Sequence, residues 1–354
     1  MYFSETYFHN FRNICGERRE WSPGLNMITG SNGAGKTNFL EGLNFLSGWG
    51  SLEKNAKMAN IVRWNSGASQ PASLWGRYLS ERGGEQSDIF ASLHTRCQLK
   101  RGDKTASAAD MRREIPVLSF MPGHMSIVKG GASHRRRLLD MTGVLVSVAY
   151  SKVLRDYQVM LKQKSAMLRK HADTRNADKL LASLGSWLWT AREELLKMIE
   201  TSAQNFSDLL PRPMDFFFSR GGGGMDEAPF DDFRKSLKRA CERERAAGIP
   251  LVGPQRDDVR FTCDGMDASV VLSRGQIRRA VSVLILASAL VVERRLMKKP
   301  ILLFDEITSE LDKAGRIREI ESLLATECQI FATTTDAEGY DGVEIYRMKD
   351  GRFL

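Results

Sequence analysis

Short apolar runs and polar stretches alternate along the N-terminal third of the chain. Tyr2–Phe8 carries aromatic side chains suited to a sheet, and Leu25–Thr29 is a short apolar run that leads into glycine, so both are predicted strands. Apolar positions between Lys36 and Leu46 share one helical face, which predicts a helix directly after the second strand. Residues 50–115 mix short apolar stretches with Gly, Ser and charge, and we interpret them as strands joined by loops.

The middle of the chain has a helical period instead. From about Leu145 to Phe206, apolar residues recur at steps of three and four in two stripes, which we interpret as core-packing faces. The polar stretch His171–Asn176 separates the stripes, so the pattern predicts an antiparallel pair of helices. The run Gly221–Gly224 has no strand-to-helix context, and we interpret it as a flexible loop.

The last hundred residues return to alternating strands and helices. Ile301–Phe304 and Gln329–Ala332 are continuous apolar runs, which is typical of buried strands in a parallel sheet. The longest nearly apolar run, Ala280–Val292, covers 13 positions. Because a bilayer-spanning helix needs about 20 apolar residues, this run suits a buried core helix.

Composition and charge narrow the class of protein. With 42% hydrophobic and 27% charged residues among 354, the chain is an ordinary globular one and is neither wholly disordered nor collagen-like. Lys and Arg number 52 against 43 Asp and Glu, a net charge of +9. This balance favours an anionic partner such as nucleic acid, nucleotide or a membrane surface, although a basic protein without such a partner fits it equally well.

The positions of the cysteines argue against a disulfide framework and against a zinc site. The five cysteines are Cys15, Cys97, Cys241, Cys263 and Cys328. Their number is odd, their spacing is wide and they form no CxxC pair, which indicates reduced thiols. The N-terminus lacks the basic and apolar segments of a signal peptide. We therefore expect a cytoplasmic protein with no membrane partner.

Gly30–Thr37 reads GSNGAGKT and fits the phosphate-binding pattern GxxxxGK[ST] in full. Its glycines allow backbone N–H groups to surround a polyphosphate, and the next helix contributes its positive end. We expect Lys36 to reach the β- and γ-phosphates of ATP and the Thr37 hydroxyl to bind Mg²⁺. The residues expected to surround the phosphates are Gly30, Ser31, Asn32, Gly33, Ala34, Gly35, Lys36, Thr37 and Asn38.

An acidic pair ends the apolar run Ile301–Phe304. Asp305 stands at the carboxyl end of this predicted strand, where it can hold hydrated Mg²⁺ together with Thr37. Glu306 is placed to orient or deprotonate an attacking water. Many strands end in an acidic turn, so this pair indicates a Mg²⁺ and water site only in combination with the phosphate-binding loop.

Three further motifs define the subclass. Leu272–Gln276 reads LSRGQ and resembles the LSGGQ signature of ABC-type ATPases. It ends 29 positions before Asp305 (305 − 276), a gap that fits one helix and one strand. Ser309–Asp312 resembles the D-loop of that class, and Thr335 stands where its switch histidine is expected.

Five motifs in this order predict an α/β ABC-type ATPase head, with a P-loop and a mixed sheet, and with an inserted mainly helical lobe that carries the antiparallel helix pair. In such enzymes the signature serves the nucleotide of the partner chain, so the resemblance implies an ATP-dependent homodimer. It assigns catalysis to Glu306, Lys36, Asp305, Ser273 and Thr335, and nucleotide contacts also to Gly275, Gln276 and Asp312.

The chain also resembles the bacterial RecF recombination-repair family over most of its length. The matching blocks, in family order, are Asn10–Asn13, Thr37–Glu41, Ser133–Asp140, Gly253–Asp258, Leu303–Glu306 and Thr333–Asp336. Gln255 and Gly123 depart from it, since the family usually has a histidine and an acidic residue there. The resemblance implies that Arg12 touches the nucleotide phosphates and that Asn32 lies at the P-loop end of the site.

Function and partners follow from the same resemblance. It implies weak DNA-stimulated ATP hydrolysis, binding of double-stranded DNA near single-strand gaps, and cooperation with RecO and RecR in loading RecA. Two alternatives stay open: an ABC-type DNA clamp, or a nuclease-associated factor outside that pathway. A nuclease of the overcoming-lysogenization class would add a metal-carboxylate domain, and about 50 residues after Asp305 leave no room for one.

A basic cluster is the candidate DNA surface. Its members are Lys129, Arg135, Arg136 and Arg137. Such residues neutralise phosphates without reading bases. A single residue of this kind is more often part of a solvated face or an internal helix cap, whereas the cluster as a whole favours DNA contact. We expect residues 1–128 and 251–354 to form the ATPase lobe and residues 129–250 the helical lobe.

Overall fold

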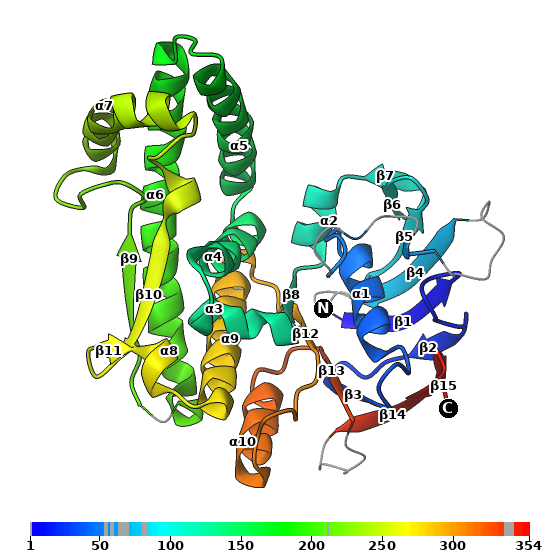
Figure 1. Cartoon of the computed structure of the whole chain (residues 1–354). Coiled ribbons are helices and arrows are strands. Elements are labelled where there is room, and N and C mark those ends of the chain that lie inside the picture. The colour runs from blue at the N-terminus through cyan, green and yellow to red at the C-terminus, as the bar shows by residue number, and fades with distance from the viewer. Residues whose placement is uncertain are drawn as a thin grey trace. The chain divides into compact units, whose positions relative to one another are not determined.

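The computed structural model describes residues 2–52, 56, 60–62, 71–79, 84–210, 212–335 and 343–354 (Figure 1). The chain divides into two compact units, Met1–Gly123 with Val292–Leu354 and His124–Val291. Among the described residues, the first unit contains two sheets and the second unit one, and each unit has an apolar core of its own.

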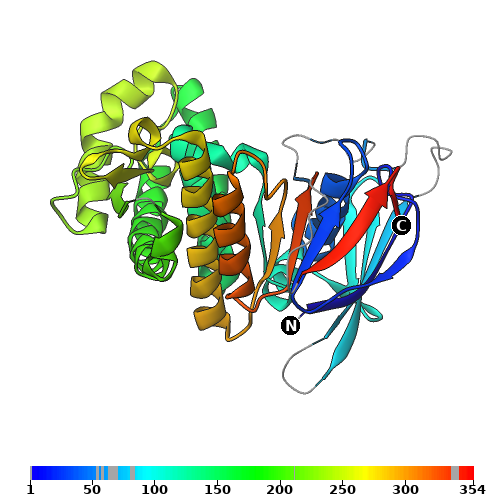
Figure 2. The same cartoon turned by 90° about the horizontal axis from the view of Figure 1, so that it is seen from below.

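A six-stranded, mainly parallel sheet is the centre of the first unit. Its order is β15-β14-β3-β13-β12-β8, and only the β14–β15 pair is antiparallel. In Figure 2 the blue β3 lies between the orange β13 and the red β14, although these strands are far apart in the sequence. The bounds are β3 Leu25–Thr29, β8 Val117–Phe120, β12 Ile301–Phe304, β13 Ile330–Thr334, β14 Glu344–Lys349 and β15 Arg352–Phe353.

The buried-strand predictions are confirmed in this sheet. All residues of β3, β8, β12 and β13 are buried, as continuous apolar runs in a parallel sheet require. The predicted helix is α1 Lys36–Leu46. The unit also contains α10 Lys313–Leu324 and α2 Ala108–Glu114. Helix α2 is absent from the sequence prediction because it buries only Met111 and therefore has no apolar stripe.

A second, antiparallel sheet completes the first unit, and α1 contacts both sheets. Its order is β2-β1-β4-β5-β6-β7. The bounds are β1 Tyr2–His9, β2 Arg18–Glu20, β4 Ala72–Leu79, β5 Gln86–Leu93, β6 Cys97–Arg101 and β7 Lys104–Ala106. Phe3 and Phe8 of β1, Phe39 of α1 and Phe331 of β13 share one buried cluster, so the core lies between the sheets.

Helices dominate the second unit. They are α3 Ser126–Lys129, α4 Ala132–Val146, α5 Val148–Arg169, α6 Arg175–Ala203, α7 Pro229–Ala247, α8 Ala268–Val271 and α9 Arg274–Leu296, whose last turn belongs to the first unit. Short 3₁₀ turns are η2 Pro122–Met125, η3 Gln204–Leu209 and η4 Pro254–Arg256. A three-stranded antiparallel sheet orders β11 Met266–Asp267, β10 Asp258–Cys263 and β9 Asp215–Ser219.

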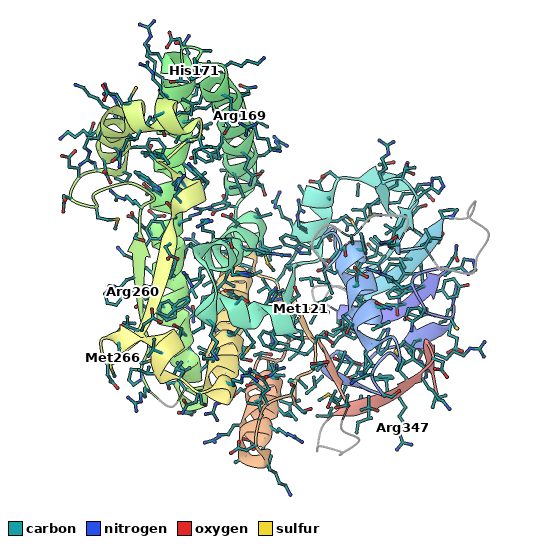
Figure 3. All side chains as sticks on the ribbon, in the orientation of Figure 1. Met121, Arg169, His171, Arg260, Met266 and Arg347 are labelled. Carbon is teal, nitrogen blue, oxygen red and sulfur yellow. The ribbon has the colours of Figure 1, made fainter. Side chains whose placement is uncertain are left out.

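The predicted antiparallel pair is α5 and α6, which pack side by side (Figure 1). Figure 3 shows Arg169 and His171 at the turn between them. Lys164 of α5 is fully buried and binds Asp178 of α6, at 2.7 Å, and Glu244 of α7, at 2.5 Å. This buried ammonium therefore fixes three helices to one another.

The run Gly221–Gly224 is not the flexible loop that the sequence suggests. The Gly221 N–H donates to Asp257 Oδ1 at 2.8 Å, and the Gly224 N–H donates to Asp232 Oδ1 at 2.9 Å. A side chain at Gly221 would meet the Gly253 carbonyl oxygen at 2.4 Å. Close packing therefore requires glycine at Gly221, and carboxylates from other segments fix the turn.

The boundaries of the units differ from the expected lobes after residue 250. Strand β10 pairs along its length with β9, which joins Asp258–Cys263 to the helical unit. This unit extends to Val291 and includes the signature segment. The pairing connects strands that are distant in sequence, which composition cannot reveal.

Among the described residues, one helix is long and apolar enough to cross a membrane by length and composition, namely α9. Its most apolar window is 78% buried within the protein. Ile285, Leu286 and Val292 are each 1% exposed or less, as expected for the core helix that the sequence predicts.

Candidate functional site

The glycine-rich turn joins the end of β3 to the start of α1, as predicted. Gly33 and Gly35 have φ angles of 82° and 109°, in the left-handed region that side chains disfavour. A side chain at Gly30 would meet the Met348 carbonyl oxygen at 2.2 Å, and one at Gly35 would meet Asn13 Oδ1 at 2.9 Å. Backbone conformation and close packing therefore both require glycine in this turn.

Lys36 folds back over the turn. Its Nζ donates to the carbonyl oxygens of Gly30, at 2.6 Å, and Ser31, at 3.0 Å. Burial lowers the pKa of this ammonium, while the carboxylates of Asp305 and Glu306 act in the opposite direction. A ligand anion would favour the charged form further, so the group is suited to holding phosphate.

A cavity of about 230 Å³ opens beside the turn. It is lined by Asn32, Gly33, Gly35, Lys36, Thr37, Asn38, Asp305 and Glu306. Pockets for whole drug-sized ligands usually measure roughly 300–1,000 Å³. The cavity therefore suits the phosphates of a nucleotide, and the base and sugar would lie beyond it.

The structure brings together the two residues predicted to bind Mg²⁺. Thr37 Oγ1 donates to the Asp305 carboxylate, at 2.9 Å from Oδ2 and 3.1 Å from Oδ1. Within the described residues, no group of three or more His, Cys, Asp or Glu side chains is placed to hold a metal ion. Mg²⁺ commonly takes one or two protein oxygens together with substrate phosphates, so this pair fits Mg²⁺ that arrives with ATP.

Thr333 of β13 connects the Asp305 carboxylate to the backbone of Glu306. Its hydroxyl donates to Asp305 Oδ1 at 2.6 Å and accepts from the Glu306 backbone N–H at 2.8 Å. Glu306 is exposed and has φ of 54°, a strained angle for this residue. Thr333 therefore fixes the turn that presents Glu306. Sequence patterns assign Thr333 no individual role, because only the pairing of β12 with β13 places it there.

Arg12 pairs with a carboxylate of the helix that follows the glycine-rich turn. Its guanidinium forms a two-point ion pair with Glu41 of α1, at 2.9 and 3.1 Å. The next residue, Asn13, contacts the glycine-rich turn instead: its Nδ2 donates to the Gly33 carbonyl oxygen at 3.2 Å, and its Oδ1 accepts from Asn38 Nδ2 at 2.8 Å. Asn13 is thus a site residue that the sequence reasoning missed, although it stands in the quoted block Asn10–Asn13.

The hairpin of β14 and β15 supports the turn from the C-terminal end. The Gly351 N–H, between these strands, donates to the Ala34 carbonyl oxygen at 2.8 Å. No local signal in the sequence identifies this contact, since it joins residues more than 300 positions apart.

The signature residues begin α9 in the second unit. The Ser273 N–H donates to Gln276 Oε1 at 2.8 Å, and the Gln276 N–H donates to Ser273 Oγ at 3.4 Å. This reciprocal arrangement is a capping box, and Ser273 is exposed at its start. Gly275 lies between them, in the first turn of the helix.

The remaining predicted nucleotide contacts lie in the first unit. Asp312 caps α10, with its Oδ1 accepting from the Gly315 N–H at 2.8 Å. Thr335 is exposed directly after β13. Its neighbour Asp336 lies outside the described residues.

The basic cluster divides into two groups. Arg135 makes a two-point ion pair with Asp258, at 2.7 and 3.0 Å, and Arg136 donates to the Asp257 carbonyl oxygen at 2.6 Å. Both guanidinium groups therefore have structural partners within the unit. Lys129 and Arg137 are exposed. Only these two of the four remain directed to solvent in the manner that a DNA surface requires.

The parallel sheet, the glycine-rich turn and the carboxylate pair define an α/β head of the P-loop type. The model of the RecF/RecN/SMC N terminal domain family matches residues 2–349. The chain belongs to this family and, within it, to the RecF family. It is 30% identical over 351 residues to the DNA replication and repair protein RecF of Symbiobacterium thermophilum, covering 96% of this chain and 92% of that protein.

Other relatives agree with this assignment. The protein of the same name from Moorella thermoacetica is 31% identical over 337 residues, covering 92% of this chain and 88% of the relative. A solved structure of the recombination mediator protein RecF with ATP, in the RecFOR pathway, has a TM-score of 0.86 at 24% identity and covers 100% of this chain and 97% of that one.

A more distant likeness extends to SMC heads. The SMC head bound to the C-winged helix domain of ScpA has a TM-score of 0.59 at 14% identity, covering 100% of this chain and 98% of that one. At these identities the likeness concerns the fold. The predicted α/β head with a helical insertion and the predicted RecF resemblance are both confirmed.

Proposed function

We propose that this protein binds and hydrolyses ATP with Mg²⁺ and thereby controls its association with DNA during recombinational repair. The observation that carries the proposal is the connected set Thr37–Asp305–Thr333–Glu306 beside Lys36, around a cavity of phosphate size. This set joins the cation for phosphate, the oxygens for Mg²⁺ and a carboxylate for water in one place.

Each group of site residues has its own part in ATP binding and hydrolysis. The N–H groups of the turn and Lys36 hold the phosphates, and Asn13 and Asn38 keep the turn in shape. Bound by Thr37 and Asp305, Mg²⁺ would neutralise charge that develops on the β- and γ-phosphates. Glu306 orients the attacking water and accepts its proton. We expect Thr335, which directly follows β13, to contact the γ-phosphate.

We assign the second half of each ATP site to a partner copy. The signature residues Ser273, Gly275 and Gln276 belong to the other compact unit and do not line the cavity. The exposed start of α9 is suited to a phosphate held by another chain. Two ATP molecules would then hold a homodimer together, and hydrolysis would release it.

DNA and protein partners follow from family membership. Relatives are named DNA replication and repair proteins, and a structural neighbour is named for the RecFOR pathway. We propose that this chain, in the cytoplasm, binds double-stranded DNA near single-strand gaps and assists RecO and RecR in loading RecA, with weak DNA-stimulated turnover. Lys129 and Arg137 are the members of the basic cluster that we retain as phosphate contacts.

Light scattering with the Glu306→Gln variant tests this function. The substitution removes the carboxylate that accepts the proton of the attacking water, so ATP should stay bound but unhydrolysed. The variant should therefore have a dimer mass with ATP and a monomer mass without it. Glu321→Gln, on the exposed face of α10, is the matched control and should behave as the wild type. A Glu306→Gln protein that stays monomeric with ATP would contradict the dimer switch.

Turnover with gapped duplex DNA tests the pathway assignment separately. We expect ATP hydrolysis to rise in its presence. If DNA leaves turnover unchanged while the Glu306→Gln dimer still forms, an ABC-type clamp outside the RecF pathway becomes the better description.

A further inference from the structure

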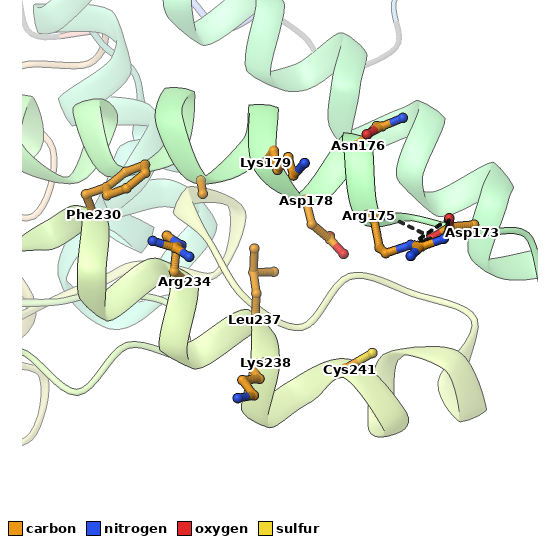
Figure 4. Close-up of a pocket in the computed structure, with 11 residues that line it drawn as sticks. Asp173, Arg175, Asn176, Asp178, Lys179, Phe230, Arg234, Leu237, Lys238 and Cys241 are labelled. Atoms are coloured by element: carbon orange, nitrogen blue, oxygen red, sulfur yellow. Dashed lines mark hydrogen bonds and ion pairs between the residues drawn. The ribbon is translucent and has the colours of Figure 1, made fainter.

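A groove of about 680 Å³ lies between the start of α6 and the length of α7 in the helical unit (Figure 4). Asn176 and Lys179 of α6 line one side of it, and Arg234 and Lys238 of α7 line the other. None of the cavity residues of the ATP site lines this groove. It is therefore a separate feature with no role in nucleotide binding.

The floor of the groove is apolar. Leu237 and Ala182 line it with 8% and 2% of their surface exposed, and Phe230 at its end is 45% exposed. The Arg234 guanidinium lies 5.8 Å from the centre of the Phe230 ring, which keeps the ring beside the charged rim. Such a floor can bury an apolar side chain of a ligand.

The rim of the groove has an excess of unpaired positive charge. Its two carboxylates are already satisfied, Asp173 by Arg175 at 2.7 Å and Asp178 by Lys164 at 2.7 Å. By contrast, the exposed cations Lys179, Arg234 and Lys238 have no ion pair with any described residue. The excess charge is therefore available to an acidic ligand.

A neighbouring hollow lengthens this basic surface along α7. It measures about 670 Å³ and shares Arg234 and Lys238 with the groove. Of its acidic residues, Glu227 binds Lys235, and Asp231 lies in the first turn of the helix. An extended or helical ligand can therefore contact both hollows at once.

The walls of the groove are held in place from beneath. Lys164 binds Asp178 on one wall, and Glu244, its other partner, belongs to the helix that forms the opposite wall. Glu244 also accepts from the Leu251 N–H at 2.7 Å. Because these contacts fix α6 against α7, the groove is preformed. Binding of a ligand therefore costs little conformational entropy in the protein.

We propose that this groove docks an acidic, amphipathic segment of a partner protein, with an apolar side chain over Leu237 and Phe230 and carboxylates on Lys179, Arg234 and Lys238. Amphipathic segments bind in this way when an apolar face meets a hydrophobic groove. Duplex DNA is the weaker fit, because phosphate contacts make no use of the apolar floor.

Selection from a library of random peptides of about fifteen residues, roughly four helical turns, tests the proposal on the full chain without nucleotide. Counter-selection uses the Arg234→Glu/Lys238→Glu variant. We expect the enriched peptides to carry Asp or Glu with Leu, Ile or Phe at steps of three or four. Enrichment of basic sequences, or no enrichment over the counter-selected pool, would overturn the proposal.

The affinity of the enriched peptide for variants of the protein then shows where the peptide binds. Charge reversal at Arg234 and Lys238, and separately Phe230→Ser, should each weaken binding at least about tenfold. Arg243→Glu is the matched control, since this exposed α7 residue does not line the groove, and it should change affinity less than about twofold. Equal binding by all variants would place the peptide elsewhere and reject the groove.

Cys241 provides a readout in the unmutated protein. Its side chain lines the groove and is half-buried, while the half-buried Cys15 and Cys97 lie in the first unit as internal controls. The peptide should slow maleimide labelling of Cys241 alone, as read by mass spectrometry. If duplex DNA protects Cys241 and the peptide does not, the groove is a nucleic-acid contact and the proposal is wrong.

Discussion

One cluster of charged residues in each unit makes an instructive comparison. In the first, Lys36, Asp305 and Glu306 line a cavity in which their charges face a common space. In the second, Arg192 is 2% exposed and donates to the fully buried Asp257 at 2.7 Å, and Lys164 is fully buried between Asp178 and Glu244. The same types of side chain thus line a ligand cavity in one cluster and stabilise the fold in the other.

Asp257 illustrates the structural use. It accepts from Arg192 Nη1, from Trp189 Nε1 at 2.7 Å and from the Gly221 N–H at 2.8 Å. Burial raises the pKa of its carboxyl, and Arg192 acts in the opposite direction. Every oxygen has a partner within the chain, so nothing is left for a ligand. A charged side chain whose hydrogen-bond partners all lie within the protein has a structural role. Charged side chains that line a common cavity indicate a ligand-binding site.

Arg192→Leu is expected to have the largest effect, on the helical unit. Removal of one member of a buried ion pair leaves the other uncompensated, which costs about 3–5 kcal/mol. Hydrogen exchange along α6 and β10 and urea unfolding would measure the loss, while ATP affinity of the folded protein should be unchanged. Arg155→Leu, at a side chain 72% exposed, is the control and should change stability by less than about 0.5 kcal/mol. If Arg192→Leu lowered the free energy of unfolding by less than about 1 kcal/mol, the buried pair would not have the structural role assigned to it.

Lys36→Ala should act on the ligand and not on the fold. Loss of the ammonium beside the phosphates should weaken ATP binding about 100-fold, measured with a fluorescent ATP analogue. The exposed Lys100→Ala is the matched control in the same unit. Affinity of Lys36→Ala within about threefold of the wild type would contradict the assignment of the cavity.

Thr333→Val separates positioning from binding. The substitution keeps the shape but removes the hydrogen bonds to Asp305 and to the Glu306 N–H. We expect turnover to fall about tenfold with ATP affinity nearly unchanged. Thr334→Val, on the same strand, breaks the hydroxyl pair with Thr308, so its turnover should stay within about twofold. Equal losses for both variants would assign Thr333 to strand packing alone.

The divided basic cluster offers a smaller test. Lys129→Ala and Arg137→Ala should each reduce the slope of DNA affinity against salt by about one, without loss of stability. Arg135→Ala should instead lower stability by about 1–2 kcal/mol, because Asp258 loses its partner. DNA affinity that depends on Arg135 in a fully stable protein would reverse this division.

The smallest expected effect is on pH dependence. Burial lowers the pKa of Lys36 from its usual 10.5, and a bound triphosphate would raise it again. Binding should therefore take up protons at alkaline pH, and ATP affinity should fall as the pH rises towards 10.5. Calorimetry in two buffers of different ionisation heat measures this uptake. Proton release on binding would have the wrong sign.

Local patterns predicted what depends on local physics. The glycine-rich turn, α1 at Lys36–Leu46, the strand Ile301–Phe304 and the α5–α6 pair all follow from periodicity or motif spacing. The partners of side chains did not follow. Arg12 pairs with Glu41 of α1, and the Gly221–Gly224 turn is fixed by Asp257 and Asp232. These contacts join residues that only the tertiary fold brings together.

Complementation between two inactive variants tests the central claim most directly. Lys36→Ala inactivates the P-loop and Ser273→Arg inactivates the signature, so neither homodimer has an intact composite site. A mixed dimer would combine the P-loop of the Ser273→Arg chain with the signature of the Lys36→Ala chain. An equal mixture should therefore recover about a quarter of wild-type turnover, since half of the dimers are mixed and each has one intact site of two. A mixture no more active than either variant alone would contradict an ATP site shared between two chains.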